Sequence, residues 1–303
     1  MNQVVVIGAV WVGFLVLFVV AAVAALMIHA RNKRLRRTEP PEPFRLLRRP
    51  GETLVKEEEA LFERMMARLV NGALGAVMVF IVPGLVVWLV PNVQALPLLG
   101  ATVLLCVAVM VWLVRRSVVD LEKRSELRLG LRGEQLVGEQ MAGLIRAGFW
   151  VFHDVPVEID GKRQNIDHVA VGPLGVVVVE TKMRSLPKKE TGKAGKVRFD
   201  GERLSWPFYG DDQAPVWQVR RCAKWLEAFV REKCGREVEA EQVIAIPGWT
   251  VVPGKFYKPR VVSGSGVSDA LLVMMEGRAR VLNEREVEKV VKGLEELCRD
   301  VED

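Results

Sequence analysis

Two carboxylates and a lysine stand at the ends of an apolar hairpin sequence, NIDHVAVGPLGVVVVETK, at residues 165–182. A turn at Gly172–Gly175 pairs the flanking strands so that Asp167 faces Glu180. Side chains directly opposite in an antiparallel pair point to the same side, with Cβ atoms roughly 5 Å apart. Lys182 lies two residues beyond Glu180 and therefore shares that face. The spacing predicts one site built from two acids and one lysine.

Carboxylates that face each other on paired strands repel, so a sheet built only for stability would avoid them. A divalent cation between Asp167 and Glu180 would remove this repulsion. Mg²⁺ prefers oxygen ligands and is commonly bound by one or two carboxylates, with water and substrate phosphate completing its shell. Lys182 would then orient the attacking water or offset charge on a phosphate. This combination predicts metal-assisted phosphodiester hydrolysis with Mg²⁺ or Mn²⁺.

A third acid, Glu134, lies in a segment with a helical pattern over roughly 131–147. It stands three residues before Val137 and so falls on the apolar stripe of this predicted helix. A carboxylate on a core-facing stripe needs a partner. The alternative is an exposed Glu134 in the first helical turn, where an acid is favoured in any case. Together with the two acids of the hairpin, the stripe position favours the site.

Several short motifs occur in one order along the second half of the chain. They are Gly130-x-x-Gly133-Glu134, Asn165-Ile166-Asp167-His168, Val171-Gly172-Pro173-x-Gly175, Glu180-Thr181-Lys182 and, in a predicted helix, Gln218. The set resembles the NERD domain, a nuclease-related domain of the PD-(D/E)xK nuclease superfamily, over about residues 127–300. By contrast, Asp160-Gly161-Lys162 fits only the general pattern of that superfamily and is predicted to be a turn.

The resemblance implies an α/β (α+β) restriction-endonuclease-like fold with a central mixed sheet flanked by helices. It also implies a metal-dependent DNA hydrolase, in which Asp167 and Glu180 bind Mg²⁺ or Mn²⁺ and Glu134 completes the surroundings of the ion. Lys182 would assist the attacking water. Gln218 would be a polar helper on the helix that faces the site.

The elements that must position these residues follow from periodicity and turn signals. We expect a strand at 149–155, the hairpin at 163–183, a second hairpin around Asp200-Gly201, a helix at 215–233, strands at 242–246 and 260–263, and a helix that Asn283 caps and that ends near Cys298. His168 points to the face opposite Asp167 and is expected to be a hydrogen-bonded structural histidine.

A basic segment follows the predicted site. Its candidate phosphate-binding residues are Arg184, Lys188, Lys189, Lys193 and Lys196, and the aromatic residues Trp206, Phe208 and Tyr209 come after it. Basic residues followed by aromatic ones suit contacts to a nucleic-acid backbone and stacking on bases. A solvated loop explains the same charges equally well.

Three uncharged apolar blocks occupy the first 114 residues, at about 4–28, 69–90 and 95–114. Each is long enough to cross a bilayer as a helix, and buried core helices are the alternative. The first block exceeds the usual apolar length of a signal peptide and has no positive charge before it, so a retained anchor is expected. The fold class is therefore extended by an all-α three-helix membrane region that precedes the nuclease-like domain.

Lysines and arginines orient these spans. They are abundant in the segment 29–68 and follow the third block as Arg115-Arg116, whereas the loop 91–94 has none. Because positive loops stay in the cytoplasm, we expect a multi-pass protein of the cell (inner) membrane with its N-terminus outside and its C-terminal domain cytoplasmic. The expected divisions are a first span at 1–30, a basic proline-rich cytoplasmic linker plus a surface helix at 31–67, a transmembrane hairpin at 68–114, a helical connector at 115–128 and the NERD domain at 129–303.

Composition limits the remaining function classes. The chain of 303 residues has a formal charge of +6 and a pI near 9.2. Its four cysteines form no CxxC pair and histidine occurs three times, which argues against a zinc site. A transporter is disfavoured because the apolar blocks carry no ionisable residue. The prediction is a membrane-anchored, metal-dependent nuclease acting on DNA, and the alternative is a catalytically silent module that binds nucleic acid or protein on a membrane platform. The oligomeric state stays open.

Overall fold

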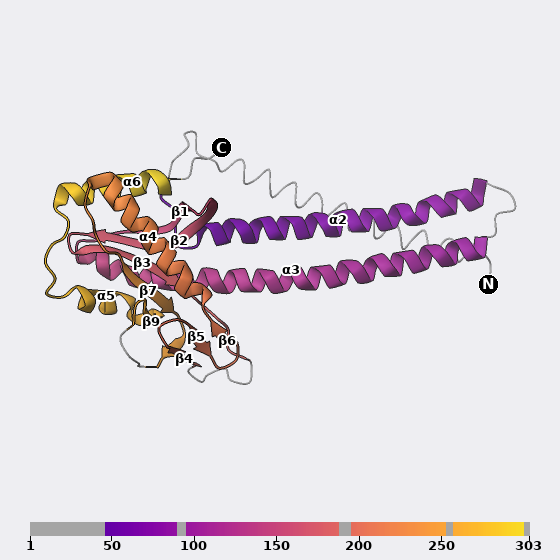
Figure 1. Cartoon of the computed structure of the whole chain (residues 1–303). Coiled ribbons are helices and arrows are strands. Elements are labelled where there is room, and N and C mark those ends of the chain that lie inside the picture. The colour runs from indigo at the N-terminus through magenta and orange to yellow at the C-terminus, as the bar shows by residue number, and fades with distance from the viewer. Residues whose placement is uncertain (1–45, 90–94, 188–194, 253–256, 300–303) are drawn as a thin grey trace. The chain divides into compact units, whose positions relative to one another are not determined.

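The computed structural model describes residues 46–89, 95–187, 195–252 and 257–299 (Figure 1). The chain separates into two compact units, residues 1–43 with 58–125 and residues 44–57 with 126–303. The short segment 44–57 therefore belongs to the same unit as residues 126–303.

The described part of the first unit consists of residues 58–89 of helix α2 (Glu52–Leu89) and residues 95–125 of helix α3 (Ala95–Arg146). Within it, Arg68 on α2 forms an ion pair with the buried carboxylate of Asp120 on α3. The described residues contain one helical segment, Gly100–Arg146, that is long and apolar enough to cross a membrane.

The membrane prediction is therefore supported only in part. The first block, 4–28, lies outside the described residues. The second block (69–90) is described only in part, and the third (95–114) overlaps the candidate span. The described residues thus contain one candidate span and not a clear three-helix membrane region.

The second unit contains a five-stranded sheet in the order β1-β2-β3-β7-β9. Its strands are β1 (Trp150–Ile159), β2 (Lys162–Gly172), β3 (Gly175–Thr181), β7 (Glu241–Ile246) and β9 (Arg260–Ser263). The first three are antiparallel neighbours, whereas β3, β7 and β9 run parallel. The predicted central mixed sheet flanked by helices is therefore confirmed for this unit.

The hairpin formed by β2 and β3 has the predicted register. Its strands pair from the turn at Gly172–Gly175 as far as His168, which lies opposite Val179. Gly175 has a φ of +136°, a conformation that glycine adopts without the cost of a Cβ. The next positions toward the open end of the hairpin are Asp167 and Glu180, as the sequence predicted.

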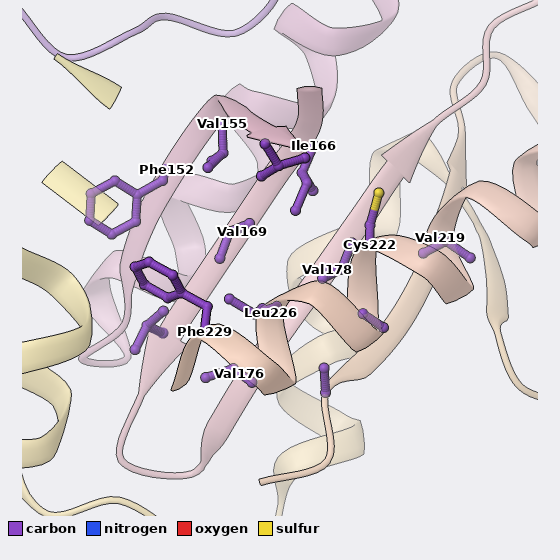
Figure 2. Packing of buried hydrophobic residues seen from close by; sticks show 14 of the residues in the cluster. Phe152, Val155, Ile166, Val169, Val176, Val178, Val219, Cys222, Leu226 and Phe229 are labelled. Atoms are coloured by element: carbon purple, nitrogen blue, oxygen red, sulfur yellow. The ribbon is translucent and has the colours of Figure 1, made fainter. Parts of the chain in front are cut away.

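Helices cover both faces of this sheet. On one face, α4 (Ala214–Cys234) and α6 (Glu284–Cys298) pack against alternate residues of the strands, and Leu226 of α4 lies over the valines of β2 and β3 (Figure 2). On the other face, the C-terminal part of α3 and α5 (Val267–Met275) pack against the remaining residues. The run Val176–Val179 is buried on both sides, as expected for a strand covered by two helical layers.

A smaller sheet has the order β6-β5-β4-β8. Its strands are β4 (Gly195–Phe199), β5 (Leu204–Trp206), β6 (Gly210–Asp212) and β8 (Trp249–Val251). β4 and β5 form the hairpin predicted around Asp200-Gly201. The predicted C-terminal helix is also confirmed, because the Asn283 side chain and Glu286 form a capping box at the start of α6.

Candidate active site

Asp167 and Glu180 lie at the open end of the β2–β3 hairpin. Asp167 is half-buried and Glu180 is buried. The backbone N–H of Thr181 donates a hydrogen bond to Asp167 Oδ2 over 2.6 Å, which holds this carboxylate against the end of β3. Glu180 Oε2 is buried and has no hydrogen-bond partner in the described part of the chain. A buried carboxylate oxygen without a donor is costly unless something else satisfies it.

The pKa values of the acids in this site are raised. Burial is the main cause and the neighbouring acids add to it, so that the pKa of Glu134 is about 9 and that of Asp167 about 7. Burial, followed by the charge of Asp167, also raises the pKa of Glu180 well above its usual range. The charges of Asp167 and Asp154 add to the shift in the pKa of Glu134, and those of Asp167 and Glu134 add to the shift in the pKa of Glu180.

Lys182 supplies positive charge beside these acids. Its charge lowers the pKa of Asp167 and of Glu180, against the larger opposite effect of burial. The Lys182 backbone N–H donates to the carbonyl oxygen of Ala245 over 2.9 Å, so the parallel pairing of β3 with β7 holds it in place. The structure therefore brings together four predicted site residues, with Glu134 contributed by α3.

Gln218 lies on α4, half-buried and one turn before Cys222. It lines a hollow of about 460 Å³ together with Trp217 and Arg221, and none of the acids lines this hollow. Burial, followed by the charges of Glu180 and Asp167, raises the pKa of the Cys222 thiol to about 12. Cys222 is therefore within electrostatic reach of these two acids. Gln218 thus occupies the helix that faces the acids but opens into a separate hollow.

Asp154 is a fourth acid that the sequence analysis did not single out. In the β1–β2 pair, His153 lies opposite His168 and Val155 lies opposite Ile166, which places Asp154 opposite Asp167. Asp154 is buried and has a φ of +51°, a left-handed conformation that costs a non-glycine residue of the order of 1–2 kcal/mol. Its signal in the sequence was a charged residue within an apolar strand pattern, which demands a partner.

The left-handed residue changes the side-chain alternation of β1. Phe152 and Val155 pack into the same core although three residues separate them, and a regular strand would place them on opposite faces. The neighbouring strand shows the same shift between Ile166 and Val169. Asp154 and Asp167 therefore sit where both strands depart from regular alternation.

The donor set fits a divalent cation in its chemistry. It offers hard carboxylate oxygens, including the unpartnered Oε2 of Glu180. Within the described residues, no group of three or more His, Cys, Asp or Glu side chains is placed to hold a metal ion together. Two carboxylates are the usual protein contribution to a Mg²⁺ site whose remaining ligands are water and phosphate. The fit therefore involves Asp167 and Glu180, with Glu134 nearby.

A cavity of about 680 Å³ gives access to the acids. The residues that line it include Glu134, Asp154 and Asp167, together with Arg48, Thr53 and Asn165, whereas Glu180 and Lys182 do not line it. This volume is within the range typical of small-molecule and cofactor sites.

Gly133 of the first motif lets β3 approach α3 closely. A Cβ at this position would lie 2.8 Å from Met183 Cβ and 3.3 Å from Thr181 Cγ2. Because Met183 follows Lys182, we expect Gly133→Ala to displace the lysine. We also expect a net decrease of about 1–2 kcal/mol in the unfolding free energy, in which the steric cost outweighs a gain in helix propensity of up to about 1 kcal/mol. Thermal unfolding checks this result. In the matched variant Gly130→Ala, the new Cβ meets only the flexible end of Leu54 at 3.3 Å, and an equal loss there would contradict the packing explanation.

His168 is fully buried and hydrogen-bonded. Its Nδ1 lies 2.8 Å from Nδ1 of His153, and its Nε2 lies 3.2 Å from Oγ1 of Thr181. The prediction of a hydrogen-bonded structural histidine is confirmed.

The basic segment is described only in part. Lys188, Lys189 and Lys193 lie outside the described residues. Arg184 pairs with Asp212 over 2.6 Å, and its guanidinium lies over the rings of Trp206 and Tyr209. Lys196 is exposed on β4. Arg184 thus serves the packing of the smaller sheet, and phosphate binding by this set stays a prediction.

Comparison with known families identifies the domain that holds these residues. Residues 129–247 match the family model described as the nuclease-related domain, NERD. No curated protein and no solved structure matches the chain. The matched segment contains Glu134, Asp154, Asp167, Glu180 and Lys182, and it ends before α5 and α6. Residues 129–247 of this chain are therefore similar to the nuclease-related domain, which supports the resemblance that their motifs predicted.

Proposed function

We propose that this domain hydrolyses phosphodiester bonds of DNA, using Mg²⁺ or Mn²⁺, at the cytoplasmic side of a membrane in which the N-terminal helices anchor the chain. The pair of Asp167 and Glu180, with the charge of Lys182 beside both, carries the proposal. The match of this segment to a nuclease-related family and the basic pI near 9.2 support a polyanionic substrate.

The residues divide the chemistry among them. A divalent cation bound by Asp167 and Glu180 would polarise the phosphate and neutralise charge that develops on it. Lys182 would orient the attacking water and stabilise the same charge. Glu134 would complete the acidic wall of the cavity, whereas Gln218 lines a separate hollow and takes no part in this scheme.

A catalytically silent binding module is the second candidate. The observation that favours it is the lack, among the described residues, of a group of three or more His, Cys, Asp or Glu side chains placed to hold a metal. Such a module would use the same fold to bind nucleic acid or protein without cleavage.

Cleavage of supercoiled plasmid by the full chain in detergent separates the two candidates. We expect nicked and linear DNA with Mg²⁺ or Mn²⁺, and intact plasmid with EDTA. Gel electrophoresis measures the products, and a parallel shift assay measures DNA binding. A folded protein that binds plasmid but leaves it intact with either metal would establish the binding module instead.

A further inference from the structure

The segment 46–57 packs against the nuclease-related domain, although about 80 residues of chain separate the two. The Arg48 backbone N–H donates to the carbonyl oxygen of Cys298 at the end of α6 over 3.1 Å. Pro50 contacts α3 where Gly138 leaves room for it, since a Cβ on Gly138 would lie 2.5 Å from Pro50 Cγ. Both contacts lie within one compact unit. This segment is therefore part of the domain that holds the acids.

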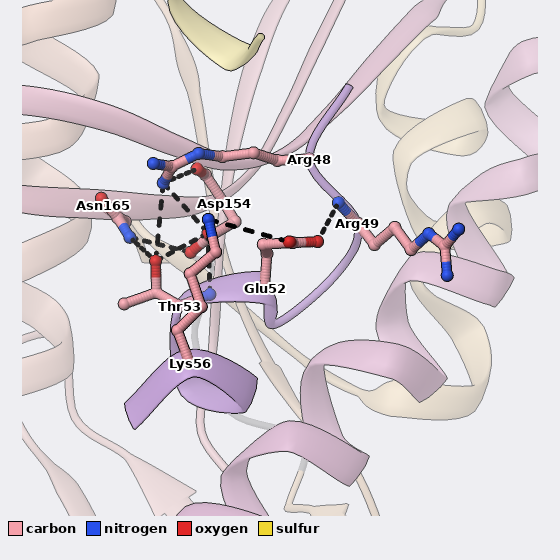
Figure 3. Close-up of polar contacts among 7 residues, drawn as sticks. All are labelled: Arg48, Arg49, Glu52, Thr53, Lys56, Asp154 and Asn165. Atoms are coloured by element: carbon pink, nitrogen blue, oxygen red, sulfur yellow. Dashed lines mark hydrogen bonds and ion pairs between the residues drawn. The ribbon is translucent and has the colours of Figure 1, made fainter. Parts of the chain in front are cut away.

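The same segment satisfies the Asp154 carboxylate (Figure 3). The Thr53 backbone N–H and hydroxyl donate to Asp154 Oδ2 over 3.0 and 2.8 Å, and Arg48 Nη1 donates to it over 3.1 Å. Asn165 Nδ2 donates to Oδ1 over 2.9 Å and also to the Thr53 hydroxyl. A carboxylate has about four acceptor positions, so these donors leave Asp154 little capacity to bind a cation.

Two of these contacts reach the acids of the site. Asp154 lies opposite Asp167 in the β1–β2 pair, so any shift of Asp154 moves the strand position beside Asp167. Gly51, two residues before Thr53, lies beside the Glu134 carboxylate, since a Cβ at Gly51 would be 3.6 Å from Glu134 Oε2, and its backbone N–H lowers the pKa of Glu134. The segment thus contacts Glu134 directly and Asp167 through Asp154.

We propose that Arg48, Thr53 and Asp154 are positioning residues of the site, and that the segment 48–53 is a wall of it that orients Glu134 and Asp167 toward the cation. The proposal rests on the metal site of the proposed function. The left-handed backbone of Asp154 supports it, because local strain persists only where surrounding contacts hold it, and a ring of donors holds it here.

Thr53→Val tests the proposal, since valine has the same shape and keeps the backbone N–H but removes the hydroxyl. The full chain in detergent is titrated with Mn²⁺ by calorimetry without DNA, and plasmid cleavage gives kcat and KM. We expect Mn²⁺ affinity and kcat to fall about tenfold to a hundredfold, as for other residues that orient metal ligands, while KM for DNA stays unchanged. Thr53→Ser restores the hydroxyl and most of the affinity. Thr250→Val, at an exposed position of β8, is the matched control.

Each outcome decides the proposal. Unchanged Mn²⁺ affinity and kcat in Thr53→Val, with only a lower unfolding midpoint, would mean that the segment supports the fold alone. If the unsubstituted chain binds Mn²⁺ but does not cleave plasmid, the proposed function fails, and the Mn²⁺ affinities of the variants still decide the positioning role. Absence of Mn²⁺ binding by the unsubstituted chain would overturn both.

Discussion

Lys182→Ala is expected to reduce metal-dependent plasmid cleavage by about a hundredfold to a thousandfold in kcat, with little change in DNA binding. A charged group that stabilises the transition state contributes roughly this much when it is removed. The substitution leaves the backbone hydrogen bond from residue 182 to Ala245 intact, so the end of β3 should stay in place. Initial rates of nicking at saturating Mg²⁺ measure the effect. Asp167→Asn should cause a similar loss, since the amide oxygen can still accept from the Thr181 N–H but the charge is gone.

The chain supplies a matched control for both substitutions. Asp160-Gly161-Lys162 carries the same acid and lysine types, and the structure confirms it as the turn between β1 and β2, with positive φ at Asp160 and Gly161. Lys162→Ala and Asp160→Asn should therefore cleave like the unsubstituted protein. Equal activity of Lys182→Ala and Lys162→Ala would exclude Lys182 from the chemistry.

Glu134→Gln should make the metal-free chain more stable at alkaline pH and less responsive to metal. The folded chain holds protons on Glu134, whose pKa is raised to about 9, and on Asp167, whose pKa is raised to about 7. The unfolded chain releases these protons near pH 4, at the ordinary carboxyl pKa values. Raised folded-state values therefore lower the unfolding free energy progressively as pH rises from about 4 to about 9. Glutamine carries no charge, so the unfolding free energy of the variant should fall less steeply with pH. At pH 8 it should exceed that of the unsubstituted chain by at least about 1 kcal/mol.

Tryptophan fluorescence during thermal unfolding in EDTA, at several pH values, measures this prediction. Adding Mg²⁺ at about a hundred times its dissociation constant should stabilise the unsubstituted chain by about 2.7 kcal/mol, and the variant by less. Glu139→Gln, an exposed position on the same helix, should change neither the pH slope nor the metal response. A pH slope in Glu134→Gln equal to that of the unsubstituted chain would contradict a raised pKa at this residue.

Much of the second unit could be predicted because its signals are local. The turn at Gly172–Gly175 sets the register of the hairpin, and a period of two places Asp167 and Glu180 next to each other. The β4–β5 hairpin followed from Asp200-Gly201, and the start of α6 from Asn283. Each of these features depends on residues only a few positions apart.

Asp154 could not be assigned from the sequence because its role depends on distant residues. Thr53 and Arg48 lie more than 100 positions before it, and no local pattern pairs them. Its left-handed φ also breaks the alternation by which a strand face is read from sequence. The segment with these donors was therefore interpreted as linker and surface helix.

The sequence by itself determined the order of the strands and helices, the hairpin register and the chemical types at its open end, since alternation, turns and caps are properties of neighbouring residues. Only the tertiary structure decided which carboxylates come together and what holds them. Glu134 reaches the hairpin because Gly133 lets α3 approach β3 closely, and the buried Asp154 carboxyl group is hydrogen-bonded because the segment 48–53 packs against β1. A buried acid is stabilised only by its surroundings, and those surroundings come from segments far apart in the chain.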